Sequence, residues 1–270
     1  MSRFPLAAAA LAAPLALALL TPAGPASAAE AALPPAALHY GLTVAGLPIA
    51  RADLSLDDRG GRYDADVEWR TVGIAGIFAA ASGKVAAQGR LVGGRPHPRA
   101  YRLIERNGDT PFDVAMALSG GRVGRLVVEP PAKIGEDIVP VEAEHLRGVI
   151  DPLSAALIPG STPASAVCDR TLPIFDGWSR WDVRLTAKTT LETAPTGMRG
   201  PTVVCSARWV PIAGHREGHR SVRYMAENRD LEVRLARLPD RDLWLPVEAS
   251  VGTMIGTARA TLETVTTGGR

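Results

Sequence analysis

The chain has 270 residues, of which 46% are apolar and 21% are charged, with a formal net charge of +2 and two cysteines. This composition excludes a disordered chain, a collagen-like or coiled-coil fibre and a small disulfide-dense scaffold. The nearly balanced charge gives no electrostatic reason to expect nucleic acid as a partner.

The first 29 residues have the layout of a secretory signal peptide. Arg3 supplies a positive charge, residues 6–20 form an apolar run, and residues 21–29 are small and helix-breaking. The small residues at the end of the leader permit cleavage after Ala28 or after Ala29. An uncleaved anchor is disfavoured, because the apolar run is shorter than a membrane span needs and contains a proline.

The leader also predicts the compartment of the mature chain. An Ala- and Pro-rich leader is typical of a Gram-negative bacterium of high GC content, so we expect the periplasm, with secretion into the medium as the alternative. No cysteine stands directly after the cleavage region, which argues against an acylated lipoprotein. No later stretch is long and apolar enough to span a bilayer, so we expect a mature chain without a transmembrane segment.

After the leader, polar and apolar residues alternate one by one, as half-buried antiparallel strands require. Turn signals such as Gly60-Gly61, Asn107-Gly108 and Asp176-Gly177 separate the alternating segments. The expected strands are 39–44, 50–56, 62–69, 100–106, 112–118, 122–128, 178–187, 201–210, 221–226, 231–235, 243–251 and 254–264. A dozen strands in succession predict an all-β fold, a large antiparallel meander or barrel rather than βαβ units.

Helices are expected at two places only. Residues 151–158 begin with Asp151 at the cap and a proline in the first turn, and Pro159-Gly160 ends them. Residues 73–82 form a weaker candidate, in which Ile74, Ile77 and Phe78 recur at helical spacing. This second segment is interpreted either as a core segment that plugs a barrel end or as a flap that contacts an apolar ligand or a membrane. Residues 129–148 are expected to form a long loop.

Five tryptophans lie in the expected strands, two of them just past the Asp176-Gly177 turn. They are Trp69, Trp178, Trp181, Trp209 and Trp244. Structural anchoring accounts for buried tryptophans in most folds. The alternative is that some of them line a barrel lumen that binds an apolar molecule, and Trp69 and Trp181 are the candidate ligand contacts.

A search for catalytic motifs finds none, so we predict a protein that is not an enzyme and needs no cofactor. His215 and His219 are four residues apart, as helical metal ligands are, but Gly214 and Gly218 predict a turn in a basic rim instead. No nucleophile elbow, phosphate-binding loop or dinucleotide fingerprint occurs, and Ser154 has no arguable base. No catalytic residue and no metal ligand is therefore assigned.

Cys168 and Cys205 are the only cysteines and both lie in the mature region. In an oxidising compartment such a lone pair predicts a disulfide bond. The alternatives are a redox-active pair, which the absence of a C-x-x-C spacing disfavours, and two buried free thiols.

Several segments resemble an exported bacterial family, that of domain of unknown function 3108. They are Asp151-Pro-Leu-Ser154, Cys168-Asp-Arg-Thr-Leu-Pro-Ile-Phe-Asp-Gly177, Arg180-Trp-Asp182, Cys205, Trp209-Val-Pro-Ile-Ala-Gly-His215, Leu245-Pro-Val247 and Ile255-Gly256. The resemblance implies one domain over residues 30–270, an open or spiral β-barrel closed by a disulfide at Cys168 and Cys205. The family is also similar, more distantly, to periplasmic envelope-integrity proteins and to half-barrels that carry lipoproteins or lipids. It implies no catalytic residue.

Two classes of function follow from these observations. The first is a non-catalytic periplasmic protein for cell-envelope maintenance, which binds a lipid, an acyl chain or a partner protein on the concave face of the barrel. The second is a hydrolase of envelope polysaccharide or lipid without a recognisable motif. A scaffold protein without a small ligand is a third interpretation.

Overall fold

A computed structural model describes residues 34–73, 76, 80–107, 111–131, 135–239 and 241–267. Its strands are β1 (Ala36–Val44), β2 (Leu47–Arg59), β3 (Arg62–Thr71), β4 (Ala81–Val92), β5 (Arg95–Asn107), β6 (Pro111–Ser119), β7 (Arg122–Glu129), β8 (Ile158–Pro159), β9 (Arg170–Phe175), β10 (Arg180–Leu191), β11 (Arg199–Ala213), β12 (Leu231–Arg237), β13 (Leu243–Thr253) and β14 (Gly256–Thr266). The helical segments within the same residues are η1 (Ala143–Leu146), α2 (Pro152–Ala155), η2 (Ala164–Ala166) and α3 (Arg220–Glu227). In this part of the chain, no helix combines the length and the apolar character needed to cross a membrane.

The described strands belong to one antiparallel sheet. Its order is β7-β6-β5-β4-β3-β2-β1-β14-β13-β12-β11-β10-β9, and the short strand β8 pairs with β13. Two meanders, β1–β7 and β9–β14, are therefore joined where β1 pairs with β14. Strands β7 and β9 form the two edges, so the sheet is not closed, and the expected all-β antiparallel meander is confirmed.

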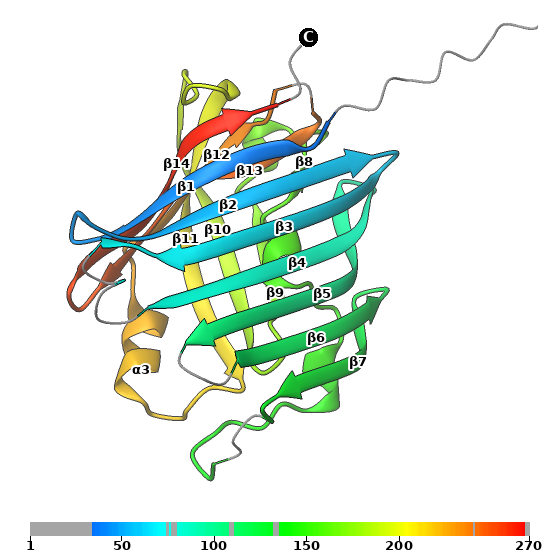
Figure 1. Ribbon diagram of the computed structural model, residues 1–270, viewed down its shortest axis with the longest axis vertical. Helices are drawn as coiled ribbons and strands as arrows, with labels where there is room; N and C mark the ends of the chain where they lie inside the picture. The colour runs from blue at the N-terminus through cyan, green and yellow to red at the C-terminus, as the bar shows by residue number, and fades with distance from the viewer. Residues whose placement is uncertain are drawn as a thin grey trace, which may run out of the picture. The chain divides into compact units, whose positions relative to one another are not determined.

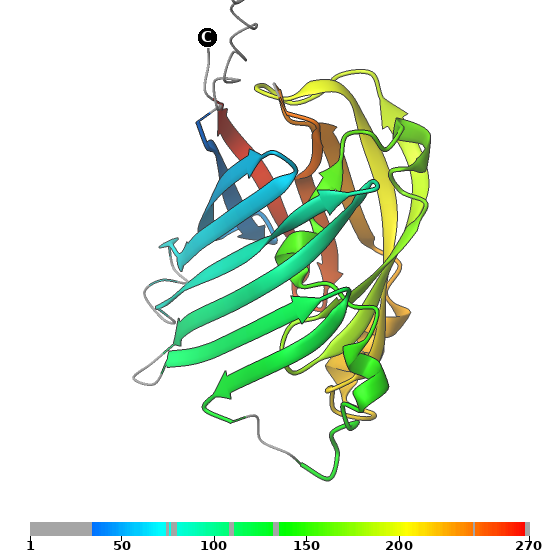
Figure 2. The same cartoon turned by 90° about the vertical axis from the view of Figure 1, so that its right-hand side faces the viewer.

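The two meanders lie on opposite sides of a shared interior (Figures 1 and 2). Helix α2 contacts β4 and β5 of the first meander and β9 of the second. One buried cluster combines residues of both, and its largest fully buried members are Leu38, Leu56, Val114, Val149, Leu157, Phe175, Leu238, Leu243 and Leu245. Burial of apolar area across this interior is the main force that holds the two meanders together.

Alternation and turn chemistry explain why the strands form. In β3, Tyr63 and Ala65 are buried while Arg62 and Asp64 are exposed, the pattern of a strand with one face on the core. Gly60-Gly61, which join β2 to β3, have φ angles of +57° and +71°. A two-residue turn with positive φ at both positions matches the twist of antiparallel strands.

Two expected elements were wrong or incomplete. Residues 221–226 are not a strand but part of α3, because Val222, Met225 and Ala226 also share one face of a helix, the face that is partly buried. A six-residue segment cannot distinguish the two periods. The helix expected over 151–158 ends at Ala155, and Ile158, the last residue expected in it, begins β8.

Strand β4 was not expected, because small residues occupy positions that face aromatic side chains. Gly83 pairs with Trp69 of β3, and Gly89 pairs with Tyr63 of the same strand. An aromatic ring that covers the glycine of a neighbouring strand supplies the apolar area that glycine lacks. Of the helix expected over 73–82, Ile74, Ile77 and Phe78 lie outside the described residues, and its last two residues begin β4.

We expect Gly89→Ala to lower the free energy of unfolding by about 1–3 kcal/mol, the usual cost of overpacking a core. A Cβ atom at Gly89 would meet the hydroxyl of Tyr63 and would lie 2.5 Å from the carbonyl oxygen of His97. Gly124→Ala in β7 is the matched control, because its Cβ atom would find its nearest neighbour at 3.8 Å. Urea denaturation of both variants tests this, and equal stabilities would contradict it.

Candidate apolar binding site

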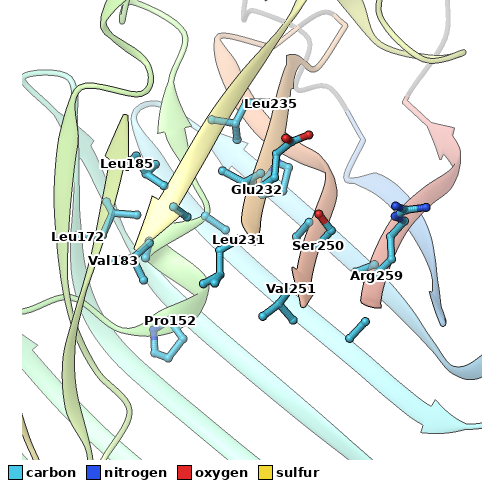
Figure 3. A pocket seen from close by; sticks show the side chains of 18 of the residues that line it. Pro152, Leu172, Val183, Leu185, Leu231, Glu232, Leu235, Ser250, Val251 and Arg259 are labelled. Atoms are coloured by element: carbon cyan, nitrogen blue, oxygen red, sulfur yellow. The ribbon is translucent and has the colours of Figure 1, made fainter. Parts of the chain in front are cut away.

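A cavity of about 470 Å³ lies between α2 and the inner face of the sheet (Figure 3). Nineteen of its lining residues are aliphatic or proline: Leu42, Ile49, Pro152, Ala155, Ala156, Ile158, Leu172, Ile174, Val183, Leu185, Ala207, Leu231, Val233, Leu235, Pro246, Ala249, Val251, Ala258 and Ala260. The others are Thr43, Glu232, Ser250 and Arg259. Ala249 is exposed although it lines the cavity, so the cavity is open to solvent.

Strand register explains why this face is apolar. Two rows of paired residues cross β12, β13 and β14 on the cavity face: Leu231, Val251 and Ala258 in one, and Val233, Ala249 and Ala260 in the other. The row between them contains Glu232, Ser250 and Arg259. Because successive side chains of a strand point to opposite faces, this polar row belongs to the outer face.

The charged groups of that polar row have partners on the outer face. The carboxylate of Glu232 accepts from Lys188 at 2.5 Å and from Arg234 at 3.1 Å. Arg259 forms an ion pair with Glu248 at 3.4 Å. These ion pairs are partly exposed, so they add little stability, but they engage the charges of the row away from the cavity.

A buried polar network holds α2 at the floor of the cavity. Asp151 caps the helix by accepting from the backbone N–H of Ser154 at 2.8 Å, and it also accepts from the Ser154 hydroxyl at 2.6 Å. The Ser154 hydroxyl lies 2.7 Å from the hydroxyl of Tyr63 in β3. Asp151 and Ser154 are fully buried, and burial raises the pKa of Asp151 to about 6 against the opposing hydrogen bonds.

This network could be predicted only in part. The Asp-Pro-Leu-Ser segment predicts a capped helix, and the structure places Asp151 at its N-cap. The link to Tyr63 spans 91 positions of the sequence and leaves no local signal. Ser154 does not line the cavity and is fully buried, so the network positions α2 rather than facing a ligand.

The two cysteines lie beside the cavity. The Sγ atoms of Cys168 and Cys205 are 1.98 Å apart, at disulfide-bonding distance, and both residues are buried. They pack in one cluster with Leu185, Ala207 and Leu235, which also line the cavity. The cross-link therefore joins β11 to the segment before β9 at the wall of the cavity.

The other predicted site residues are not brought together here. Ile74, Ile77 and Phe78 lie outside the described residues. Trp69 lies over Gly83 in the first meander and does not line the cavity. Trp181 of β10 pairs with Ile174, which does line it, but Trp181 itself is not among the lining residues.

His215 and His219 do not line this cavity. His219 directly precedes α3, and its Nδ1 atom lies 2.8 Å from the Ser221 hydroxyl. The backbone carbonyl of His215 accepts from Val139. Within the described ranges there is no group of three or more His, Cys, Asp or Glu side chains arranged to hold a metal ion.

Sequence reasoning missed the eight apolar residues of β12–β14 that line the cavity. They are small and aliphatic residues of β12–β14, which alternate as in any strand with one buried face. Alternation shows which residues share a face, but it does not show which strands enclose a cavity.

The fold and the cavity define an open, β-barrel-like protein with an apolar interior site. The family model described as "Protein of unknown function (DUF3108)" matches residues 37–263, so the chain belongs to this family, as the sequence resemblance indicated. Among the curated proteins no relative was found. A solved structure, the β-barrel-like protein of domain of unknown function DUF1849 from Brucella abortus, is similar with a TM-score of 0.53 and 9% identity, covering 87% of this chain and 98% of that one.

Proposed function

We propose that this protein is an exported, non-catalytic component of the bacterial cell envelope that binds the acyl chain of a lipid. The observation that carries the proposal is the apolar cavity of about 470 Å³. Its volume falls within the range of small-molecule binding sites, which are mostly apolar and concave.

The chemistry of the wall favours hydrocarbon over a polar ligand. A hydrocarbon chain needs no hydrogen-bond partners, and the lining side chains on the cavity face of β12–β14 provide none. A sugar or a peptide would lose its hydrogen bonds to water on entering such a site without replacing them. Burial of apolar area supplies the driving force for binding an acyl chain that lies along Leu231, Val233 and Leu235.

The leader and the cysteine pair support the envelope location. Residues 1–29 have the layout of a signal peptide, and a cysteine pair at bonding distance suits an oxidising compartment such as the periplasm. An envelope protein of this kind meets lipids and lipoproteins as its natural surroundings.

The decisive test is to express the chain with its leader and to purify it from the periplasm without detergent. Native mass spectrometry and lipid extraction then show whether an apolar molecule accompanies the protein. A bound lipid is the expected result. A protein that is empty, and stays empty after incubation with envelope lipids, would overturn the proposal.

We expect Ala249→Phe to weaken the binding of a fluorescent fatty acid, cis-parinaric acid, by about tenfold, because the new ring occupies space at the exposed wall of the cavity. Ala100→Phe is the matched control, since Ala100 is an exposed strand residue of β5 that does not line the cavity. Titrations followed by fluorescence compare the two. An equal affinity of both variants would show that the fatty acid binds elsewhere.

A further inference from the structure

A second cavity, of about 810 Å³, lies beside the apolar one and has a different character. Three arginines from separate strands line it: Arg95 of β5, Arg170 of β9 and Arg184 of β10. One carboxylate, that of Asp169, lines it as well. Arg95, Arg170 and Asp169 together carry a formal charge of +1, and Arg184 adds a further positive charge from the face of β10 opposite Arg170, so the cavity favours an anion.

The two cavities are adjacent and have two lining residues in common. Leu172 and Leu185 line both of them. Arg170 pairs with Leu185 across β9 and β10, and it lies two residues from Leu172 on the same strand. Because paired residues and residues two apart share a face of the sheet, Arg170 stands on the cavity face, directly next to the apolar wall.

The arginines have no counter-ion within the described residues. Arg95, Arg170 and Arg184 form no ion pair there, and Asp169 forms none either, whereas Arg102 on the outer face is held by Asp113 at 2.7 Å. The Nε atom of Arg170 is buried without a hydrogen-bond partner. Burial lowers the pKa of Arg170, and the charge of Arg95 adds to this effect.

A partly buried cation with an unpaired donor is costly to keep, unless an anion compensates it. Guanidinium groups bind carboxylate and phosphate oxygens with two parallel hydrogen bonds. An anionic group between Arg170 and Arg95 would satisfy the buried donor and relieve the repulsion between the two cations.

We infer that the arginine cavity binds the anionic head group of the same lipid whose acyl chain lies in the apolar cavity. The ligand is therefore an acidic amphiphile, with carboxylate or phosphate oxygens at Arg95 and Arg170. This inference rests on the proposed function and extends it, since it names the class of lipid.

The test uses two probes with the same acyl chain, palmitate and its neutral glycerol monoester. Each is used below the concentration at which it forms micelles. Isothermal titration of the mature protein is expected to show palmitate binding at least about tenfold more tightly than the ester. Arg170→Gln and Arg95→Gln are each expected to lower the affinity for palmitate about tenfold. The affinity for the ester is expected to stay unchanged in both variants.

Arg125→Gln is the matched control, since this exposed arginine of β7 lines neither cavity and its loss changes the net charge equally. Arg95 is exposed, so its variant tests the inference even if Arg170→Gln perturbs folding. Equal affinities of both probes, unaffected by the arginine variants, would overturn the inference while the acyl-chain proposal stands. Failure of both probes to bind would overturn both.

A third arm separates a head group from a free anion. Inorganic phosphate alone is expected to bind weakly and to compete with palmitate only at high concentration, because it makes no use of the apolar cavity. Phosphate that binds more tightly than palmitate would overturn the inference in favour of a free-anion site.

Discussion

Replacing Cys205 with serine is expected to lower the free energy of unfolding of the oxidised protein by about 4 kcal/mol. The bond closes a loop across a sequence separation of 37, and constraint of the unfolded chain gives this magnitude for a loop of that size. Both cysteines are buried in the cluster that contains Trp244, so the variant also leaves a hydroxyl in an apolar site.

Urea denaturation with and without reductant measures the effect. Reductant is expected to destabilise the parent and to leave Cys205→Ser unchanged, and Cys168→Ser is expected to behave in the same way. If the oxidised parent unfolds at the same urea concentration as either variant, the pair carries no stabilising bond.

The second large effect concerns pH and comes from Asp151. Burial raises its pKa from 3.8 to about 6, so the folded protein binds this proton more tightly than the unfolded chain does. The resulting stabilisation is complete below about pH 4 and is lost as the pH rises to about 6. The difference between the two pKa values corresponds to about 3 kcal/mol.

Asp151→Asn removes this dependence and keeps the local structure. The amide oxygen accepts from the backbone N–H of Ser154, and the amide nitrogen donates to its hydroxyl, which then donates to Tyr63. Relative to the parent, the variant is expected to gain about 3 kcal/mol between pH 4 and pH 7.

Urea denaturation at one-unit steps of pH compares the parent with Asp151→Asn and with Asp137→Asn, the same change at an exposed carboxylate. Burial also raises the pKa of Asp176 to about 6, so the variant is expected to retain the part of the pH dependence that Asp176 causes. Curves for Asp151→Asn and the parent that stay parallel over the whole range would contradict the prediction.

The head-group inference depends on the acyl-chain proposal, whereas the acyl-chain proposal does not depend on the head-group inference. An acyl chain can occupy the apolar cavity whether or not an acidic group binds at Arg170. The arginine cavity is assigned to a head group because it adjoins the apolar one, with Leu172 and Leu185 lining both. Neutral and acidic probes of equal chain length therefore distinguish the two steps.

The sequence by itself determined the local features of this protein. Alternation predicted most strands, the Asp-Pro pair predicted the start of α2, and the presence of only two cysteines predicted which residues pair. The strands and the helix start depend on neighbouring residues of the chain, and two cysteines can pair in only one way. These features therefore leave a signal in the sequence. Strands β4 and β9 and helix α3 were among the exceptions. In β4 and α3, glycine and a short amphipathic segment give an ambiguous pattern.

Only the tertiary structure decided which distant segments meet. The pairing of β1 with β14 joins the two meanders, and the position of α2 between them forms the cavity floor. Arg95 of β5 and Arg170 of β9 lie far apart in the sequence, and nothing near either of them marks the other. Side-chain periodicity encodes which face of a strand is buried, whereas a cavity depends on how several faces are placed in space, and that placement is set by the packing of the whole interior.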